Sequence, residues 1–247
     1  HMEALVRMRD ECGQILPPGA FIPVAERFGF MPDIDRYVIR HAIYTLATRP
    51  GLQMFINLSG LTLSDSSLGG YIRRVLQETG VDPRRVCFEV TETTALLNLA
   101  HTQELMREIK ALGCRFALDD FGSGFASFAY LRSLPVDYIK LDGSFTYDLD
   151  SNATNRALAK AVVDIAHVLG KAVIAERVER QSDAVLADEL VDRALLRGVD
   201  PVLGDALRLR RRDPRRVEGV EHHRALRLQQ VVLVVDGRRL DLTPQMF

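Results

Sequence analysis

Polar side chains follow several short apolar runs of the sequence, at the points where these runs end. The residues concerned are Asn57, Glu89, Asp119, Asp120, Lys140 and Glu176, and Glu3 adds a carboxylate near the start of the chain. Carboxylate and amide oxygens are the preferred ligands of hard cations such as Mg²⁺ and Mn²⁺, and they suit zinc or copper poorly. Five converging carboxylates would need more than one divalent ion for neutralisation. The pattern therefore predicts a two-metal site that activates water and stabilises the leaving oxygen of a phosphoester displacement.

Asp119 and Asp120 are adjacent in the sequence, and a glycine-flanked turn follows them. Two like charges side by side repel each other unless a positive group lies between them. We expect Asp119 to bridge the two ions and Asp120 to bind one of them. Lys140 would orient the attacking water or neutralise the negative charge that develops on the phosphate. A single polar residue at a strand end can simply cap nearby backbone, but such residues on five expected strands favour one common site.

The elements that must position these residues alternate between two kinds of apolar pattern. Short apolar runs predict strands at Ala4–Met8, Met54–Leu58, Val86–Val90, Arg115–Leu118, Tyr138–Leu141 and Ala172–Ala175. Between and after them, helical spacing predicts helices at Asp33–Ala47, Leu68–Thr79, Leu99–Leu112, Ala126–Leu131, Thr154–Leu169 and Gln181–Leu196. Continuous apolar strands separated by helices form a parallel sheet buried on both faces. The sequence thus predicts an α/β fold, a TIM-like (β/α)8 barrel with room for an irregular or antiparallel edge strand, whose catalytic residues collect at the carboxyl ends of the strands.

Composition narrows the classes of partner. The chain has 247 residues and a formal net charge of -1, with one locally basic stretch at residues 208–216, so we expect no nucleic-acid binding. No apolar run approaches the roughly 20 residues that span a bilayer, so we expect no membrane segment within this fragment. Cys12, Cys87 and Cys114 fit neither a disulfide framework nor a zinc pattern, which favours reduced thiols in a cytoplasmic protein.

Several motifs occur together in a fixed order over residues 3–180. They read EALVR, FIPVAERFGF, FINLS, FEVTET, ALDDFGSGFASFAYLRSLPVDYIKLDGSF and VIAERVE. In this set and order the chain resembles the EAL family of cyclic di-GMP phosphodiesterases, named after the tripeptide that stands here at residues 3–5. The resemblance implies hydrolysis of one phosphodiester bond of cyclic di-GMP, with two Mg²⁺ or Mn²⁺ ions, to give linear pGpG.

The resemblance also implies a role for each matching residue. One metal would be held by Glu3, Asn57, Glu89 and Asp119, and the other by Asp119 and Asp120 with Glu176 nearby. The catalytic residues would be Lys140, Glu176 and Glu92, of which Glu92 holds the DDFGSG loop in its working position. The substrate-binding residues would be Arg7, Asp142 and Glu179. Family partners would include an upstream sensory domain, a GGDEF domain or both, and the sequence leaves a homodimer open.

The sequence departs from the family pattern after Glu176. Arg177 replaces the usual glycine of this motif, and no Gln-Gly pair follows Glu176 anywhere in the chain. These departures leave open an alternative, a catalytically weak or inactive receptor domain for cyclic di-GMP. They also predict a boundary, with the barrel at residues 3–205, diverged toward its C-terminal part, and a basic linker and β-hairpin tail at residues 206–247. We expect this hairpin, with its turn at Asp236 and Gly237, to complete or cover the barrel edge in cis or from a second molecule, or else to form a separate dimerisation hairpin.

Overall fold

The strands of the protein form one mixed sheet. The computed structural model describes residues 2–10, 12, 14–122, 128–146, 149–176 and 231–235. The strands are β1 (Met2–Arg9), β2 (Ile15–Leu16), β3 (Met54–Asn57), β4 (Val86–Thr91), β5 (Arg115–Phe121), β6 (Tyr138–Leu141), β7 (Ala172–Ala175) and β8 (Val231–Val235). Their order in the sheet is β2-β1-β3-β4-β5-β6-β7, and β8 pairs with β1. All neighbours are parallel except β1 and β2, which are antiparallel.

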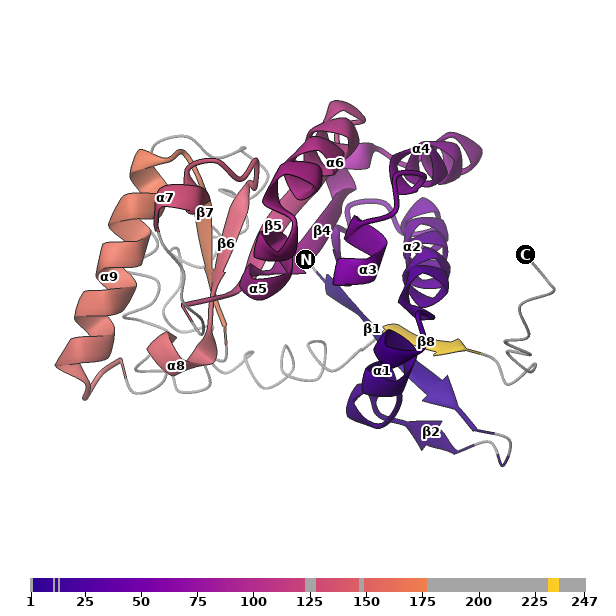
Figure 1. Cartoon of the computed structure of the whole chain (residues 1–247), viewed down its shortest axis with the longest axis horizontal. Helices are drawn as coiled ribbons and strands as arrows, with labels where there is room; N and C mark the ends of the chain where they lie inside the picture. Colours follow the sequence, from indigo (N-terminus) through magenta and orange to yellow (C-terminus); the bar gives the residue numbers. More distant parts are fainter. Residues whose placement is uncertain are drawn as a thin grey trace.

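Helices follow most of the strands, in the alternation that the sequence predicts. They are α1 (Pro18–Arg27), α2 (Met31–Ala47), α3 (Gly60–Leu63), α4 (Leu68–Thr79), α5 (Glu92–Leu97), α6 (Leu99–Ala111), α7 (Phe128–Leu131), α8 (Gly143–Thr146) and α9 (Ala153–Val168), with a 3-10 turn η1 at Pro83–Arg85. The helices pack against the strands. Helix α2 contacts β3, and α9 lies beside β7 (Figure 1). The TIM-like α/β architecture is confirmed, and its antiparallel edge strand is β2.

Alternation along the strands divides the core into two layers. Val86, Phe88 and Val90 of β4 belong to the large cluster that also contains the buried faces of α2, α4, α6 and α9. Cys87 points to the other face of the sheet. There it belongs to a small second cluster that consists of Phe55, Cys87, Ala117, Tyr138 and Ala172. Residues further along the same strands can therefore pack on this inner layer.

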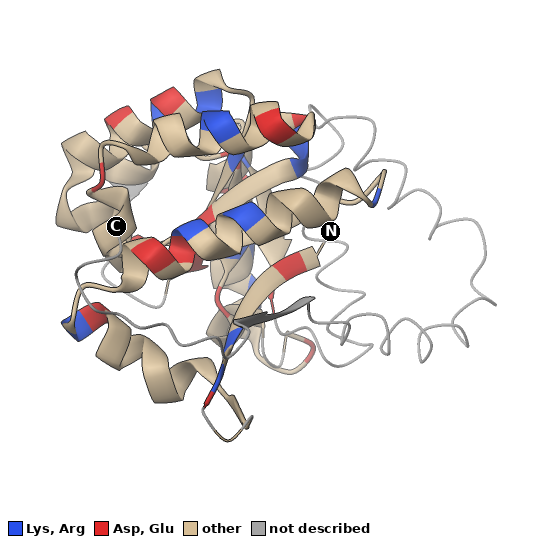
Figure 2. Ribbon diagram, turned by 90° about the vertical axis from the view of Figure 1, so that its right-hand side faces the viewer, with Lys and Arg blue, Asp and Glu red and all other residues tan. Residues whose placement is uncertain are grey.

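The outer surface of the helices carries charges of both signs. Along the helices that face the viewer in Figure 2, positions of Lys and Arg are interspersed with positions of Asp and Glu. This distribution fits the net charge of -1. Among the described residues, no helix combines the length and apolarity needed to cross a membrane.

Several expected element boundaries are confirmed and others are extended. Helix α4 and strands β6 and β7 begin and end where the sequence predicts, and Gly80, Gly113 and Gly170 adopt positive φ angles directly after or near helix ends. Strand β5 continues past the expected end at Leu118 to Phe121. The expected helix at 181–196 and the basic stretch at 208–216 lie outside the described residues.

Candidate active site

Lys140 stands at the centre of the site. Its Nζ atom lies 2.8 Å from Glu89 Oε1, 2.9 Å from Asp119 Oδ1 and 2.7 Å from Glu176 Oε1. Lys140 extends from β6, whereas its three partners come from β4, β5 and the residue after β7. Only 8% of the Lys140 side chain is exposed. The structure therefore brings together, around one buried ammonium group, carboxylates that are far apart in the sequence.

A β-bulge explains how the adjacent Asp119 and Asp120 can serve the same site. In a regular strand, successive side chains point to opposite faces of the sheet. The pairing of β5 with β6 shifts register between Leu118 and Phe121, and Asp120 has a φ angle of 53°. Such a bulge bends the strand and redirects its side chains. As a result, carboxylate oxygens of Asp119, Asp120 and Glu176 all lie within 4.8 Å of one another.

Glu3 and Asn57 form a second part of the site on neighbouring strands. Asn57 Nδ2 donates a hydrogen bond of 2.9 Å to Glu3 Oε1. Asn57 is also the register partner of Glu89, which connects this pair to the strand that carries the Lys140 ion pair. Burial is the main cause of the raised pKa of Glu89, and the negative charge of Glu3 adds to this rise, which agrees with the proximity of the two residues. The oxygen-bearing residues of β1, β3 and β4 thus share one end of the inner face.

Burial and the crowding of carboxylates shift the proton affinities of the site. Burial raises the pKa of Glu89 to about 8, against an opposing effect of Lys140. Burial also raises the pKa of Glu176, and the nearby Asp119 and Asp120 add to the rise. For Lys140, burial lowers the pKa, but the contacts with Glu89, Glu176 and Asp119 outweigh it and raise the pKa above its usual value. One ammonium group therefore stays charged among carboxylates whose negative charge exceeds it.

Some carboxylate oxygens of the site are buried without a hydrogen bond. Glu89 Oε2 accepts none from the described residues, whereas Glu89 Oε1 and Asp119 Oδ1 have only the Lys140 ammonium group as a partner, at 2.8 Å and 2.9 Å. The ion pairs with Lys140 supply charge to Glu89 Oε1 and Asp119 Oδ1, but no such pair with Lys140 reaches Glu89 Oε2. Buried anionic oxygens are costly unless they are paired or coordinate a metal. The site therefore has the donor type and the unsatisfied oxygens that a hard divalent cation requires.

Glu92 contacts Gly122 of the DDFGSG segment and Tyr130, which follows this segment in the sequence. The Glu92 side chain is 2% exposed, and its Oε2 accepts a hydrogen bond of 3.2 Å from the Gly122 backbone N–H. Its Oε1 accepts a hydrogen bond of 2.9 Å from the Tyr130 hydroxyl group. Gly122 has a φ angle of 97°, and a Cβ atom there would lie 2.4 Å from the Phe145 ring, so only glycine fits.

Tyr130 is a site residue that the sequence analysis missed. Its partner Glu92 lies 38 positions away, so no local pattern indicates the contact. The available signal is its place shortly after the glycine-containing loop, in a short segment that otherwise contains apolar residues. Tyr130 extends from α7, so the bond also connects this helix to α5.

The three residues expected to bind substrate have different environments. Arg7 lies on β1 in alternation with Glu3, which places both on one face, and it is half-buried, with Nη1 donating 2.9 Å to the carbonyl oxygen of its neighbour Val6. Asp142 follows β6, and its Oδ1 accepts a hydrogen bond of 2.9 Å from the backbone N–H of Ser144 in α8. Glu179 and Arg177 lie outside the described residues.

Comparison with known proteins adds independent findings. The sequence model of the EAL domain family matches residues 1–195. A protein of Shewanella oneidensis named cyclic di-GMP phosphodiesterase PdeB is 43% identical over 210 residues, which make up 83% of this chain and 24% of that protein. PdeF of Escherichia coli, also named a cyclic di-GMP phosphodiesterase, is 32% identical over 206 residues, which cover 82% of this chain and 27% of PdeF. The chain thus spans about a quarter of the length of these relatives.

A similar solved structure is the FimX EAL domain from Pseudomonas aeruginosa bound to c-di-GMP. It matches with a TM-score of 0.72 and 30% sequence identity, and the match covers 76% of this chain and 77% of that one.

Proposed function

Because the chain belongs to the EAL domain family, we propose that it hydrolyses cyclic di-GMP to linear pGpG by a two-metal phosphodiesterase mechanism. The convergence of Glu89, Asp119 and Glu176 on Lys140 is the observation that carries this proposal. The names of the relatives PdeB and PdeF and the c-di-GMP bound to the FimX domain support the substrate.

The proposed cofactors are two Mg²⁺ or Mn²⁺ ions. The ligands of one ion would be Glu3, Asn57, Glu89 and Asp119. Those of the other would be Asp119 and Asp120, with Glu176 nearby and bound to it directly or through water. Support comes from the oxygen-only donor set and from the buried Glu89 Oε2, which accepts no hydrogen bond from the described residues. When bound, the ions would supply an activated water and stabilise the leaving oxygen.

The chain's own residues bind and orient the substrate around this centre. The Lys140 ammonium group, held by its three carboxylates, orients the attacking water and offsets the negative charge of the phosphate. Arg7 can pair its planar guanidinium group with two phosphate oxygens. Glu92 accepts a hydrogen bond from Gly122 and thereby keeps the start of the DDFGSG loop, which carries Asp119 and Asp120, in position. Asp142 and Glu179 complete the proposed substrate contacts.

A turnover assay tests this function. We expect the chain with Mn²⁺ or Mg²⁺ to convert cyclic di-GMP to pGpG, measured by chromatography of the nucleotides. Glu3→Ala serves as the blank, and Lys140→Met should lower kcat by about 100-fold or more because general acid–base and electrostatic groups contribute on that scale. Lys160→Met is the matched control, since that lysine is 49% exposed on α9 and should leave kcat unchanged.

Binding measurements separate this function from the receptor alternative. Tight binding of cyclic di-GMP without pGpG formation would favour a receptor domain, and the departures at Arg177 and at the Gln-Gly motif are the sequence features that would account for it. If Lys140→Met retains the full turnover rate of the wild type, this result would contradict the proposed role of the lysine.

We further propose that a sensory or GGDEF domain regulates this domain in the complete protein, in which it acts as a homodimer.

A further inference from the structure

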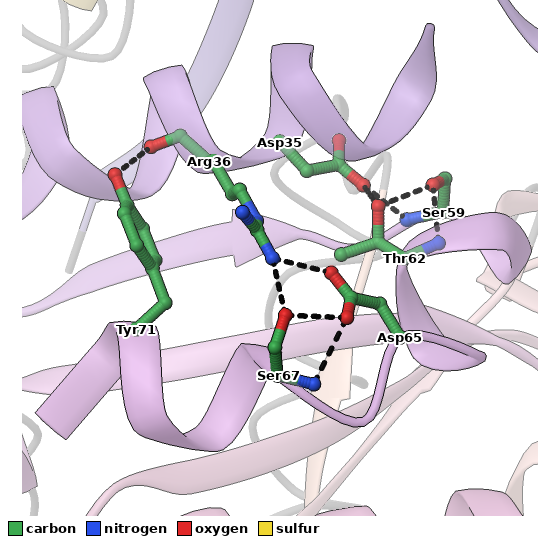
Figure 3. Close-up of polar contacts among 7 residues, drawn as sticks. All are labelled: Asp35, Arg36, Ser59, Thr62, Asp65, Ser67 and Tyr71. Carbon is green, nitrogen blue, oxygen red and sulfur yellow. Dashed lines mark hydrogen bonds and ion pairs between the residues drawn. The ribbon is translucent and has the colours of Figure 1, made fainter. Parts of the chain in front are cut away.

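Asp35 is a buried carboxylate of α2 that lies outside the site described above. It is 5% exposed, and its Oδ2 accepts hydrogen bonds of 2.9 Å from the Ser59 backbone N–H and 2.6 Å from the Thr62 hydroxyl group (Figure 3). No ion pair within the described part of the chain includes Asp35. Because burial of a carboxylate without a cation is costly, packing alone would favour an apolar residue at this position. The two hydrogen bonds are therefore the physical reason for a carboxylate here.

Both donors belong to the turn that follows β3. Ser59 Oγ accepts a hydrogen bond of 3.2 Å from the Thr62 backbone N–H and thereby caps the short helix α3. Ser59 Oγ and Thr62 Oγ1 also lie 2.9 Å apart. Asp35 thus closes a ring of hydrogen bonds with the N-cap residue Ser59 and with Thr62, the third residue of α3, and it fastens the turn to the long helix α2. A turn of this kind, held from two sides, has little freedom to rotate.

The turn directly follows Asn57, the last residue of β3, and supports the backbone of this residue. Ser59 comes two positions after Asn57, and the intervening Leu58 donates its backbone N–H to the carbonyl oxygen of Glu89 at 2.8 Å. Asn57 is itself exposed, so its side-chain direction depends on the backbone at the strand end more than on surrounding packing. Its hydrogen bond of 2.9 Å to Glu3 requires one such direction.

We propose that Asp35 is a positioning residue that fixes the turn after β3 and thereby holds Asn57 in place as a metal ligand. This inference rests on the proposed function, because it assumes that Asn57 and Glu3 bind a divalent cation. Groups that orient a metal ligand from behind typically change metal affinity or activity by about 10–100-fold when they are removed. Asp35 acts through the turn and contacts neither of the proposed ligands.

The experiment measures Mn²⁺ binding to the complete chain by calorimetric titration with the metal alone, together with the thermal midpoint Tm. Asp35→Ala should weaken Mn²⁺ binding by about 10-fold or more. Asp35→Asn should bind nearly as tightly as the wild type, because its amide oxygen can still accept both hydrogen bonds. Thr62→Val, which removes one of the two donors, should weaken binding to an intermediate degree.

Matched controls separate positioning from general stability. Thr102→Val removes another buried threonine hydroxyl group, from α6, and should leave the Mn²⁺ affinity unchanged. Asp65→Ala removes a carboxylate that binds Arg36 of α2 and Ser67 but does not contact Ser59 through its side chain, and it should lower Tm without weakening metal binding (Figure 3).

Two results would overturn the inference. If the Asp35→Ala protein has a lower Tm but binds Mn²⁺ as tightly as the wild type, Asp35 contributes to stability alone and does not position Asn57. If Asp35→Ala does not fold, Thr62→Val decides, and equal Mn²⁺ affinity in Thr62→Val and Thr102→Val rejects the positioning role. A wild-type chain that binds no Mn²⁺ would overturn the proposed function as well. If the wild type binds Mn²⁺ and neither Asp35→Ala nor Thr62→Val weakens this binding, only the present inference is overturned.

Discussion

At the scale of single residues, the site balances one ammonium group against an excess of carboxylates. Lys140 pairs with three carboxylates, while Glu3 and Asp120 add negative charge nearby. Glu89 is the most deeply buried acid of the set, with 1% of the residue exposed. It therefore has the strongest reason to retain a proton when no metal is bound, and burial raises its pKa to about 8.

This pKa shift predicts how the stability of the metal-free chain depends on pH. Glu89 keeps its proton in the folded state up to about pH 8, whereas the unfolded chain releases it near its ordinary value of 4.5. Between these values the folded state binds more protons, so this contribution to the free energy of unfolding falls as pH rises. In chelator, the Tm of the wild type should fall relative to Glu89→Gln as the pH rises from about 5 to about 8, and the difference should level off above that. Parallel Tm curves for the two proteins would contradict a raised pKa.

At the scale of elements, Glu92 links three parts of the fold. It is the first residue of α5, and it receives hydrogen bonds from Gly122, directly after β5, and from Tyr130 of α7. The bulge that carries Asp119 and Asp120 lies in the same strand β5. The Glu92 carboxylate therefore holds the backbone at Gly122, two residues after the proposed metal ligand Asp120.

Removal of one hydroxyl group tests this link. Tyr130→Phe leaves a buried oxygen of Glu92 without its donor, at a cost of about 1–3 kcal/mol. We expect kcat for cyclic di-GMP to fall by about tenfold or more. Tyr71→Phe is the matched control, because its hydroxyl group donates 2.9 Å to the Arg36 carbonyl oxygen between α4 and α2. Both variants should lose some stability in thermal unfolding, but only Tyr130→Phe should lose activity. Equal kcat values would reject the link.

At the scale of the whole molecule, the last described strand pairs with the first. Strand β8 pairs in parallel with β1, with Ala4 opposite Val231 and Met8 opposite Val235, and Figure 1 shows the two strands side by side. Strand β1 carries both Glu3 and Arg7. Without β8, the backbone groups of β1 on that side would form an open edge, which is a template for aggregation. The predicted division of the chain at residue 205 remains a prediction, although β8 lies in the barrel sheet.

Two truncations test the contribution of β8. Deletion of residues 225–247 should lower Tm and increase aggregation, measured by light scattering, because it removes the partner of β1. Deletion of residues 236–247 is the control, since it keeps β8, and it should behave closer to the wild type. If both truncated proteins match the wild type in Tm and scattering, the pairing of β1 with β8 contributes nothing measurable to the fold.

The main elements of the barrel were predictable from the sequence because their apolar periodicity is strong. The six expected strands all occur, and helix α4 begins at Leu68 and ends at Thr79 as expected. Helix α1 was not predicted, because Pro17, Pro18 and the internal Pro23 argue against a helix. Tertiary packing overrides this local preference by burying Phe21 and Ala25.

The sequence by itself determined the chemical character of the site, because the types of its residues and their places at strand ends limit it to oxygen ligands and one lysine. Only the tertiary structure decided how they meet. The bulge at Asp120 turns two adjacent carboxylates toward one site. Strands and helices far apart in the chain are joined by the three ion pairs of Lys140 and by the contacts of Glu92 with Tyr130 and of Asp35 with Thr62. Local patterns report periodicity and propensity, whereas these contacts depend on strand register and on which helix lies against which strand.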